Sequence, residues 1–597
     1  MKANHYILTA LLSAAVLPAL AQDLNPTVEV TNIFDGKLLE IHKPAQEMAL
    51  PDSLTRFDLR FDYSVFDNPY RGVYAFKPYV VDMTPQPDAY DARTLYVRAG
   101  AGYALHPTFD LIWTPFHQKA FTMNVYAQHH SYLGTYRRLF VTRRAADTKA
   151  PLFLLSNHEK AVETTPDPDY QGYDLCTRVG ANGLLEWGEG AFTFDAGYYG
   201  LNTSLYEKSN YNAADLRLGV KSKDLGSNYM YYDANLAYRF GADDIAFAGE
   251  GFQTLRAHDI ALRGTFGPVI GSHNRLLVDA ALGLSVYGGM LNSSAGNFNI
   301  TPRYVLNLSG VNLSLGVKIS MSMADDDVYQ GYPLKPTKGQ FLYPEVHADF
   351  VLWQNYIDLY ADVTGGDTIY GYSVQKDANH FFHPRMGRGA GPFCDLTAER
   401  VNARLGMRGN ITPKFRYDLS GGWKLVKNGR VENVFFGKMR TGNLPSDLMP
   451  GVGYADYQMA FADLKAVWDA KPFLVEGVLS YRWTDLYKKE KPGFGPAPFT
   501  AMVRGTYNWN DRIIGGLRVE GASARAGIAA PLPALSYSAV AVRVPGWVDL
   551  GVFGEFVVTR RLSFWLETGN LLNMTIQRIP MYTESGLTVT AGLTFTL

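Results

Sequence analysis

The sequence is poor in cysteine, in charged residues and in long apolar runs. After the N-terminal region it contains no apolar run of about 18 residues or more, which excludes membrane-spanning helices. Charged residues make up 19% of the chain and the formal net charge is −1, so we expect neither nucleic acid nor a strongly charged partner. A glycine-rich phosphate loop, a Cys-x-x-Cys pair and a nucleophile elbow are also missing, and we therefore expect no enzyme activity and no cofactor.

The two cysteines, Cys176 and Cys394, both stand beside long loop-like stretches. An oxidising compartment would permit a disulfide between them. Two unpaired thiols are about as well supported, because a sequence does not give the distance between two side chains.

The first residues have the pattern of a secretory signal peptide. Lys2 precedes an apolar run that ends at Leu20, and an A-x-A cleavage site ends at Ala21. The alternative, an N-terminal membrane anchor, is disfavoured because the run is short and the cleavage site is good. We expect residues 1–21 to be removed after Ala21. Because no cysteine follows the site, a lipoprotein is not expected.

Residues 22–93 differ from the rest of the chain because they contain seven prolines and little sustained alternation. Proline at this density argues against central strands. We predict that this segment is an extended lead-in, lying in the periplasm or in the lumen of the domain that follows, rather than a packed domain.

Aromatic residues and strict alternation are what the chain has in abundance. Tyr, Phe and Trp make up 13% of the residues, as expected where aromatic girdles flank a membrane. In the last stretch, 587–597, apolar residues alternate with threonine and glycine, ending at Leu597. This period of two indicates a strand with one apolar and one small polar face. Such a strand is typical of the closing strand of an outer-membrane barrel.

The same alternation recurs from Thr94 onward, in stretches of about ten to thirteen residues, longer than the strands of ordinary globular sheets. Short turns such as 188–190 alternate with long polar stretches such as 367–399, and this alternation is typical of outer-membrane barrels. We predict an all-β protein whose residues 94–597 form a large antiparallel transmembrane β-barrel of about 16–22 strands.

Charged residues occupy the polar face in the middle of several predicted strands. In a barrel with an apolar outer face, these side chains point into the lumen. The candidate lumen-facing charges are Asp279, Lys318, Asp358, Asp362, Arg404, Arg408, Asp418 and Lys424.

Arginine pairs stand in the long stretch after Gly134. If this loop is extracellular, guanidinium groups could bind lipopolysaccharide phosphates in bidentate fashion; a plain solvated loop is the favoured alternative. The candidate lipopolysaccharide contacts are Arg137, Arg138, Arg143 and Arg144.

Other polar clusters give no catalytic or metal site. His129 and His130 are adjacent and so point to opposite strand faces, and no nucleophile stands at a recognisable spacing. The aspartates at 325–327 lack the spacing of a calcium loop. His380 and His383 have no further ligand at a conventional spacing, so we interpret them as residues of a surface loop.

Two regions of the chain resemble a known family. The first, 341–366 with 379–382 and 404–422, contains Phe-Leu-Tyr-Pro-Glu-Val and Asn-His-Phe-Phe. The second is Gly569-Asn570-Leu571-Leu572-Asn573 ahead of the final strand. Both resemble Bacteroidota TonB-dependent-receptor-like outer-membrane barrels. Members of the wider family carry a plug of well over a hundred residues, and we expect this chain to lack one.

The resemblance implies a receptor-like or transporter-like barrel, or a porin-like channel, in the outer membrane of a Gram-negative bacterium. Its expected surroundings are outer-membrane lipid and lipopolysaccharide. The alternative is a non-conducting structural or assembly subunit, blocked by its own loops or lead-in and joined to other outer-membrane or periplasmic subunits.

Overall fold

The structure is a computed structural model of the chain. The predicted segments 1–21 and 22–93, and with them the expected absence of a plug, lie outside the residues that it describes. The described residues are 94–118, 120–142, 152–156, 169–205, 208–223, 230–247, 251–270, 273–290, 292–324, 328–329, 332–333, 339–353, 356–382, 395–440, 444–486, 495–531 and 540–597.

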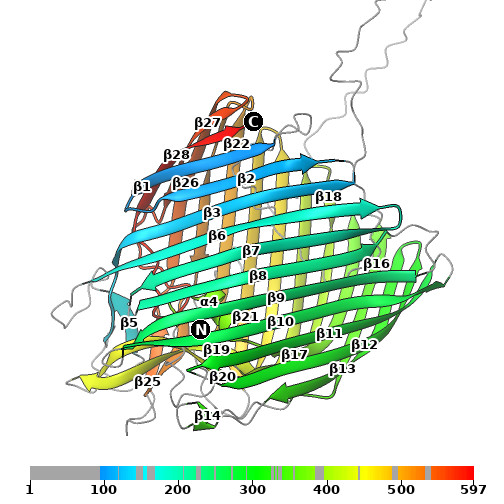
Figure 1. Cartoon of the computed structure of the whole chain (residues 1–597), viewed down its shortest axis with the longest axis horizontal. Coiled ribbons are helices and arrows are strands. Elements are labelled where there is room, and N and C mark those ends of the chain that lie inside the picture. The colour runs from blue at the N-terminus through cyan, green and yellow to red at the C-terminus, as the bar shows by residue number, and fades with distance from the viewer. Residues whose placement is uncertain are drawn as a thin grey trace, which may run out of the picture. The chain divides into compact units, whose positions relative to one another are not determined.

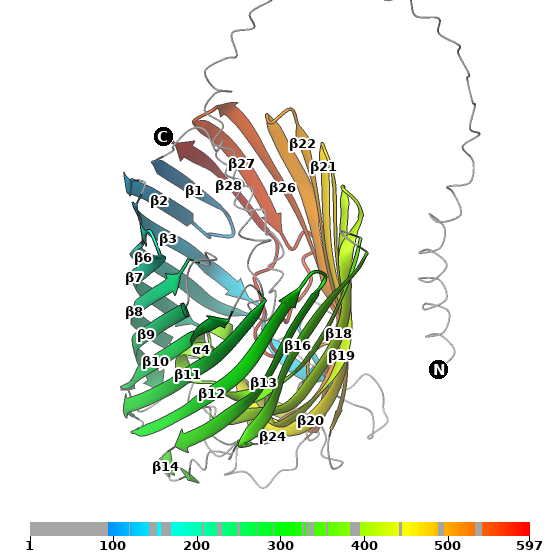
Figure 2. The same cartoon turned by 90° about the vertical axis from the view of Figure 1, so that its right-hand side faces the viewer.

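Most of the described residues form a closed antiparallel barrel of 22 strands. Figures 1 and 2 show the barrel wall from two sides. The barrel confirms the predicted fold class and lies at the upper end of the predicted strand number. The barrel strands are β1 Leu95–Tyr103, β2 Thr108–His117, β3 Phe121–Tyr136, β6 Tyr170–Trp187, β7 Gly190–Ser204, β8 Lys208–Ser222, β9 Met230–Phe247, β10 Gly251–Ile270, β11 Asn274–Gly289, β12 Ser293–Leu308, β13 Val311–Ala324, β16 Leu342–Trp353, β17 Ile357–Ile369, β18 Leu396–Thr412, β19 Phe415–Arg440, β20 Leu444–Ala470, β21 Phe473–Leu486, β22 Phe499–Trp509, β23 Ile513–Ala522, β26 Trp547–Thr559, β27 Leu562–Gly569 and β28 Thr588–Thr596.

The final strand closes the barrel against the first. β28 pairs antiparallel with β1, with Phe595 opposite Val97, and the two strands lie side by side in Figure 1. The backbone N–H of Leu95 donates to the carbonyl of Leu597 over 3.0 Å. The prediction that the C-terminal stretch is the closing strand is therefore confirmed.

Connection lengths differ between the two ends of the barrel. At the short-turn end, two residues separate β6 from β7 (188–189) and β26 from β27 (560–561). At the opposite, long-loop end, residues 370–395 connect β17 to β18, and residues 570–587 connect β27 to β28. In outer-membrane barrels short turns face the periplasm and long loops face outward, so we assign the long-loop end to the outside.

Alternation separates an apolar outer face from a polar inner face. On β11, Leu276 and Val286 are exposed, whereas Leu277 and Tyr287 are buried. Tryptophans form an exposed girdle near the short-turn end, and an apolar band with an aromatic girdle indicates a membrane-spanning barrel. The girdle tryptophans are Trp113, Trp187, Trp353, Trp468 and Trp509.

Additional strands at the long-loop end extend the barrel sheet. The tip of β19 pairs parallel with β24, which pairs antiparallel with β25. β25 pairs parallel with β5, and β5 pairs antiparallel with β4. The remaining elements are β4 Leu139–Thr142, β5 Leu152–Ser156, β14 Val328–Tyr329, β15 Tyr332–Pro333, β24 Arg525–Pro531, β25 Val540–Val544 and α4 Tyr372–Ala378.

Within the described part of the chain, no helix is long and apolar enough to cross a membrane.

Candidate functional site

Helix α4, from the connection between β17 and β18, packs on the inner side of the barrel wall (Figure 2). Its seven residues are too few for a stable isolated helix, so tertiary contacts must hold it. Tyr372 is fully buried in an apolar cluster, with its ring 6.1 Å from that of Tyr211 on β8. The Tyr211 hydroxyl donates to Ser373 over 3.1 Å.

A buried ion pair fixes the same helix. The Lys376 Nζ and the Asp243 carboxylate are 3.3 Å apart, and both side chains are 0% exposed. Lys376 also donates to Ser209 over 2.6 Å and to the carbonyl of Phe382 over 3.2 Å. Burial lowers the pKa of Lys376, and the facing Asp243 carboxylate opposes that shift. A charge buried this deeply is tolerated only because each of its donors meets an acceptor.

The connection between β27 and β28, residues 570–587, also folds inward, and barrel-side arginines hold it there. Arg137 donates to Thr575 over 2.9 Å and to the carbonyl of Asn573 over 2.7 Å. Arg525 Nη2 donates to the carbonyls of Gln577 and Arg578, at 2.9 Å each. These contacts fix the backbone of the loop directly.

Arg578 anchors the tip of this loop among three carboxylates. Its Nε lies 2.5 Å from Glu584 and its Nη2 lies 3.4 Å from Asp549, while Nη1 pairs with Glu520. Its guanidinium stacks 4.7 Å over the ring of Trp547. Burial raises the pKa of the Glu584 carboxyl, which Arg578 counteracts.

The two inward segments meet each other inside the barrel. The rings of Phe381, just after α4, and Tyr582 are 5.2 Å apart, and Phe381 also contacts Tyr136 on β3 at 5.5 Å. Because α4 also contacts Arg239 on β9 and Arg430 on β19, a continuous set of contacts crosses the lumen in its long-loop half.

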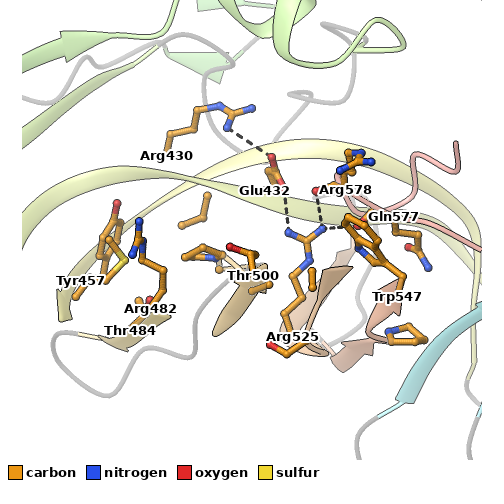
Figure 3. A pocket seen from close by; sticks show the side chains of 18 of the residues that line it. Arg430, Glu432, Tyr457, Arg482, Thr484, Thr500, Arg525, Trp547, Gln577 and Arg578 are labelled. Carbon is orange, nitrogen blue, oxygen red and sulfur yellow. Dashed lines mark hydrogen bonds and ion pairs between the residues drawn. The ribbon is translucent and has the colours of Figure 1, made fainter. Parts of the chain in front are cut away.

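A pocket of about 530 Å³ lies beside this crossing, on the inner wall (Figure 3). Five cationic and two anionic side chains line it, together with aromatic, hydroxyl and small apolar groups. The charged lining residues are Lys424, Arg430, Arg482, Arg525, Arg578, Glu432 and Glu520.

Glu432 lies between two of these arginines, as Figure 3 shows. Its carboxylate oxygens are 3.8 Å from Arg430 Nη1 and 3.7 Å from Arg525 Nη1. Both distances exceed those of direct charge-assisted hydrogen bonds, which are about 2.7–2.9 Å. Arg430 Nε also donates to Gln375 of α4 over 2.8 Å. The pocket is thus connected to both inward segments.

A second cavity of about 1000 Å³ lies along β3 and β6–β10, toward the short-turn end. Its wall carries polar side chains such as Asn124 and Asn182, which are hydrogen-bonded to each other over 3.1 Å. Polar space therefore reaches the inner wall on the short-turn side of the crossing.

The predicted lumen charges lie on the face opposite the exposed apolar side chains, and most make a polar contact with a neighbouring strand. Lys424 lines the pocket; the others stand elsewhere on the wall. The contacts are Asp279 with Arg303 (2.6 Å), Lys318 with Glu345 (2.8 Å), Asp362 with His347 (2.9 Å), Arg408 with Asp349 (3.1 Å), Asp418 with Tyr360 (2.7 Å), Lys424 with Glu399 (3.6 Å) and Arg404 over the Phe461 ring (5.2 Å), with Asp358 opposite Arg408 in the ladder.

The predicted lipopolysaccharide contacts do not form one group. Arg137 is buried and held by the β27–β28 loop, so a lipid phosphate would have to displace these partners. Arg138 stacks 5.0 Å over Tyr170. Arg143 and Arg144 lie outside the described residues, and lipopolysaccharide contact stays a prediction.

The remaining polar residues form no recognisable catalytic set. His129 contacts Thr177 over 2.8 Å, and His130 lies 3.4 Å from Asp110. His380 contacts Asp174 over 2.8 Å. The described residues include no group of three or more His, Cys, Asp or Glu that could hold a metal.

Three predicted features involve residues that are not described, namely His383, the aspartates at 325–327 and Cys394. Both alternatives for Cys394 and the partly buried Cys176, a disulfide bridge or two unpaired thiols, therefore stay untested.

Sequence reasoning missed Arg430, Glu432, Arg525 and Arg578. Arg430 and Glu432 continue the even-numbered inner series of β19, but Asn428-Gly429 interrupts it and is typical of a turn. The structure instead has an irregularity here, with Asn428 at a φ of 51°. Arg525 and Arg578 belong to or border connections that lack a sustained periodic pattern.

Solved structures of known proteins share the fold of this barrel. The barrel matches the iron transporter FrpB of Neisseria meningitidis (TM-score 0.58, 10% identity, 84% of this chain and 81% of that one). It also matches the copper transporter OprC (0.57, 11%, 84% and 80%) and the ferric enterobactin receptor PfeA of Pseudomonas aeruginosa (0.55, 12%, 84% and 80%). No family model and no curated protein matches the sequence. The chain therefore shares the closed, antiparallel 22-strand barrel fold of these proteins.

Proposed function

We propose that this chain is a receptor-like transporter of the Gram-negative outer membrane, which admits a solute through its barrel. The observation that carries the proposal is a closed 22-strand barrel with a pocket beside the lumen crossing and polar space on its short-turn side. The similar structures are named as iron, copper and ferric enterobactin proteins. Those names support transport as a class and leave the solute of this chain undetermined.

The inward segments are the gate in this proposal. On its way from the long-loop end, a solute meets the two inward segments, which contact each other through Phe381 and Tyr582. The loop 570–587 is held by side-chain contacts such as those of Arg137 rather than by barrel ladders. Its release would leave the wall intact, because closure depends on β28 and β1.

Conductance in planar bilayers tests the proposal. Wild-type protein should stay closed or conduct briefly, whereas a variant with residues 574–584 replaced by a Gly-Ser linker should conduct steadily. Arg137→Ala, which keeps the loop but removes its donors to Asn573 and Thr575, should open intermittently. Arg560→Ala, in a short turn, is the matched control and should behave like wild type.

Heat-modifiable migration on gels shows whether each variant has folded into a barrel. A linker variant that is folded yet never conducts would overturn the transport proposal. It would favour the second candidate, a structural or assembly subunit.

The second candidate is supported by the buried Lys376–Asp243 pair, which holds α4 inside the barrel. In that case the crossing is a permanent closure and the long loops serve partner subunits. Stoichiometric copurification of other outer-membrane or periplasmic proteins in mild detergent would support it. Isolation of a lone monomer that conducts after loop replacement would exclude it.

In either case the remaining expectations are part of the proposal. These are cleavage after Ala21, a Bacteroidota lineage, the absence of a plug, and an environment of outer-membrane lipid and lipopolysaccharide.

A further inference from the structure

We infer that the pocket lined by Arg430, Arg525 and Glu432 binds a compact organic anion that carries carboxylate or phosphate groups. This inference rests on the proposed function, because it names the class of solute that the transporter receives. Its volume of about 530 Å³ is in the range of small-molecule sites, about 300–1000 Å³.

The charge balance of the pocket favours an anion. Of the five cationic side chains that line it, Lys424, Arg482 and Arg578 pair with carboxylates of their own, so the uncompensated positive charge lies at the other two. Arg430 and Arg525 share the single carboxylate of Glu432, which lies 3.8 Å from one guanidinium and 3.7 Å from the other. Two positive charges thus face one negative charge, and neither ion pair is close.

The donor geometry also favours an oxyanion. A guanidinium has five N–H donors in a planar fork that matches carboxylate and phosphate groups. Arg430 uses Nε on Gln375, and Arg525 uses Nη2 on the carbonyls of Gln577 and Arg578. The Nη1 groups face Glu432 only at long range, so a ligand oxygen entering between them would gain direct hydrogen bonds.

The uncharged part of the pocket lining favours an organic ligand over a bare ion. Thr484 and Thr500 supply hydroxyl groups, while Tyr457 and Trp547 supply aromatic surface. Side chains of these types contact the carbon skeleton and hydroxyl groups of an organic acid or a phosphate ester. The side chains that cluster in Figure 3 come from neighbouring strands of the barrel wall, β19 to β23 and β26, from β24 and from the inward loop.

Calorimetric titration of the purified full-length protein tests this inference. The probes are citrate and inorganic pyrophosphate as anions, glucose as a neutral solute and putrescine as a cation. At least one anion should bind saturably at one site, more weakly at higher salt. The neutral and cationic probes should not bind.

Two charge variants give opposite expected results. Arg430→Gln should weaken anion binding roughly tenfold or more, because a hydrogen bond to a charged group is lost. Glu432→Gln should strengthen it roughly tenfold, because the carboxylate that competes with the ligand is gone. Arg217→Gln, a lumen arginine outside this pocket, should leave the affinity unchanged.

A purely structural role for Glu432 would not produce tighter binding when it is neutralised. The inference is overturned if no anionic probe binds saturably, or if Arg430→Gln and Glu432→Gln bind like wild type while both remain folded. It is also overturned if glucose binds as well as the anions do.

The two proposals fail separately. Loss of anion binding with normal conductance of the linker variant overturns the ligand class and leaves transport in place. A folded linker variant that never conducts overturns transport, whatever the pocket binds.

Discussion

Replacing Lys376 by methionine should release α4 from the barrel wall without opening the barrel. The side chains of Lys376 and Asp243 are both 0% exposed and lie 3.3 Å apart. Lys376→Met keeps most of the side-chain volume but leaves the Asp243 carboxylate without its cation. It also removes the donors to Ser209 and to the carbonyl of Phe382.

The magnitude follows from the depth of burial. Breaking one partner out of a buried pair costs about 3–5 kcal/mol, because the remaining charge stays buried and uncompensated. The barrel strands are held by their own backbone hydrogen bonds. The lost free energy therefore weakens the docking of α4 and leaves the barrel folded. Since about 1.4 kcal/mol corresponds to a factor of ten, opening of the helix should become roughly a hundred to several thousand times more frequent.

Hydrogen exchange of the α4 amides measures this directly. Gln375 N–H donates to Gly371 over 3.1 Å and Asn379 N–H donates to Gln375 over 2.9 Å, so both amides are protected only while the helix is docked and formed. Lys376→Met should lower their protection by this factor. Lys208→Met, at an exposed lysine, should change nothing.

A second variant separates charge from packing. Lys376→Met with Asp243→Leu removes both charges, so it should recover much of the lost protection, because apolar replacements of buried pairs are often neutral. The reasoning is refuted if Lys376→Met keeps wild-type protection of the α4 amides. It is also refuted if the double variant loses as much protection as the two single substitutions added together.

Further predictions concern closure, the inward loop and the lipid face. Deleting Phe595–Leu597 removes the backbone contacts of Leu597 with β1 and should abolish membrane assembly; surface labelling of an assembled truncated chain would contradict this. Burial raises the pKa of Glu584 above its ordinary value of 4.5. At a pH between 4.5 and the raised pKa, the docked loop therefore binds more protons than the released loop. Docking should therefore strengthen as pH falls through that window and weaken as pH rises, a trend visible as fewer channel openings at acidic pH; the opposite trend would contradict it. Leu405→Arg, at an outer-face position 70% exposed, should lower the free energy of unfolding in liposomes by about 2–4 kcal/mol. Leu405→Ala should cost clearly less, and equal costs would place this residue away from lipid.

The barrel itself was predictable because a period of two assigns each side chain to one face. On β28 the sequence pattern places Leu593 and Phe595 outside, and the structure leaves both exposed while Thr594 and Thr596 are buried. The closing pair with β1 could be predicted for the same reason.

The site could not be predicted because it depends on connections that have no sustained period. Nothing in the sequence brings Lys376 to Asp243, or Arg525 to the carbonyl of Gln577, since loop paths follow from packing rather than from alternation. On β19 the period of two does continue, but Asn428-Gly429 has the pattern of a turn. The sequence therefore predicts that the strand ends before Arg430.

The added sheet at the long-loop end has a mechanical consequence. The tip of β19, then β24, β25, β5 and β4, are joined in series by backbone ladders. These strands belong to three separate connections of the barrel, so none of the connections can shift alone without breaking hydrogen bonds with its neighbours. Movement of these three connections is therefore coupled, and a covalent tether that fixes any one of them to the barrel wall would also restrain the other two.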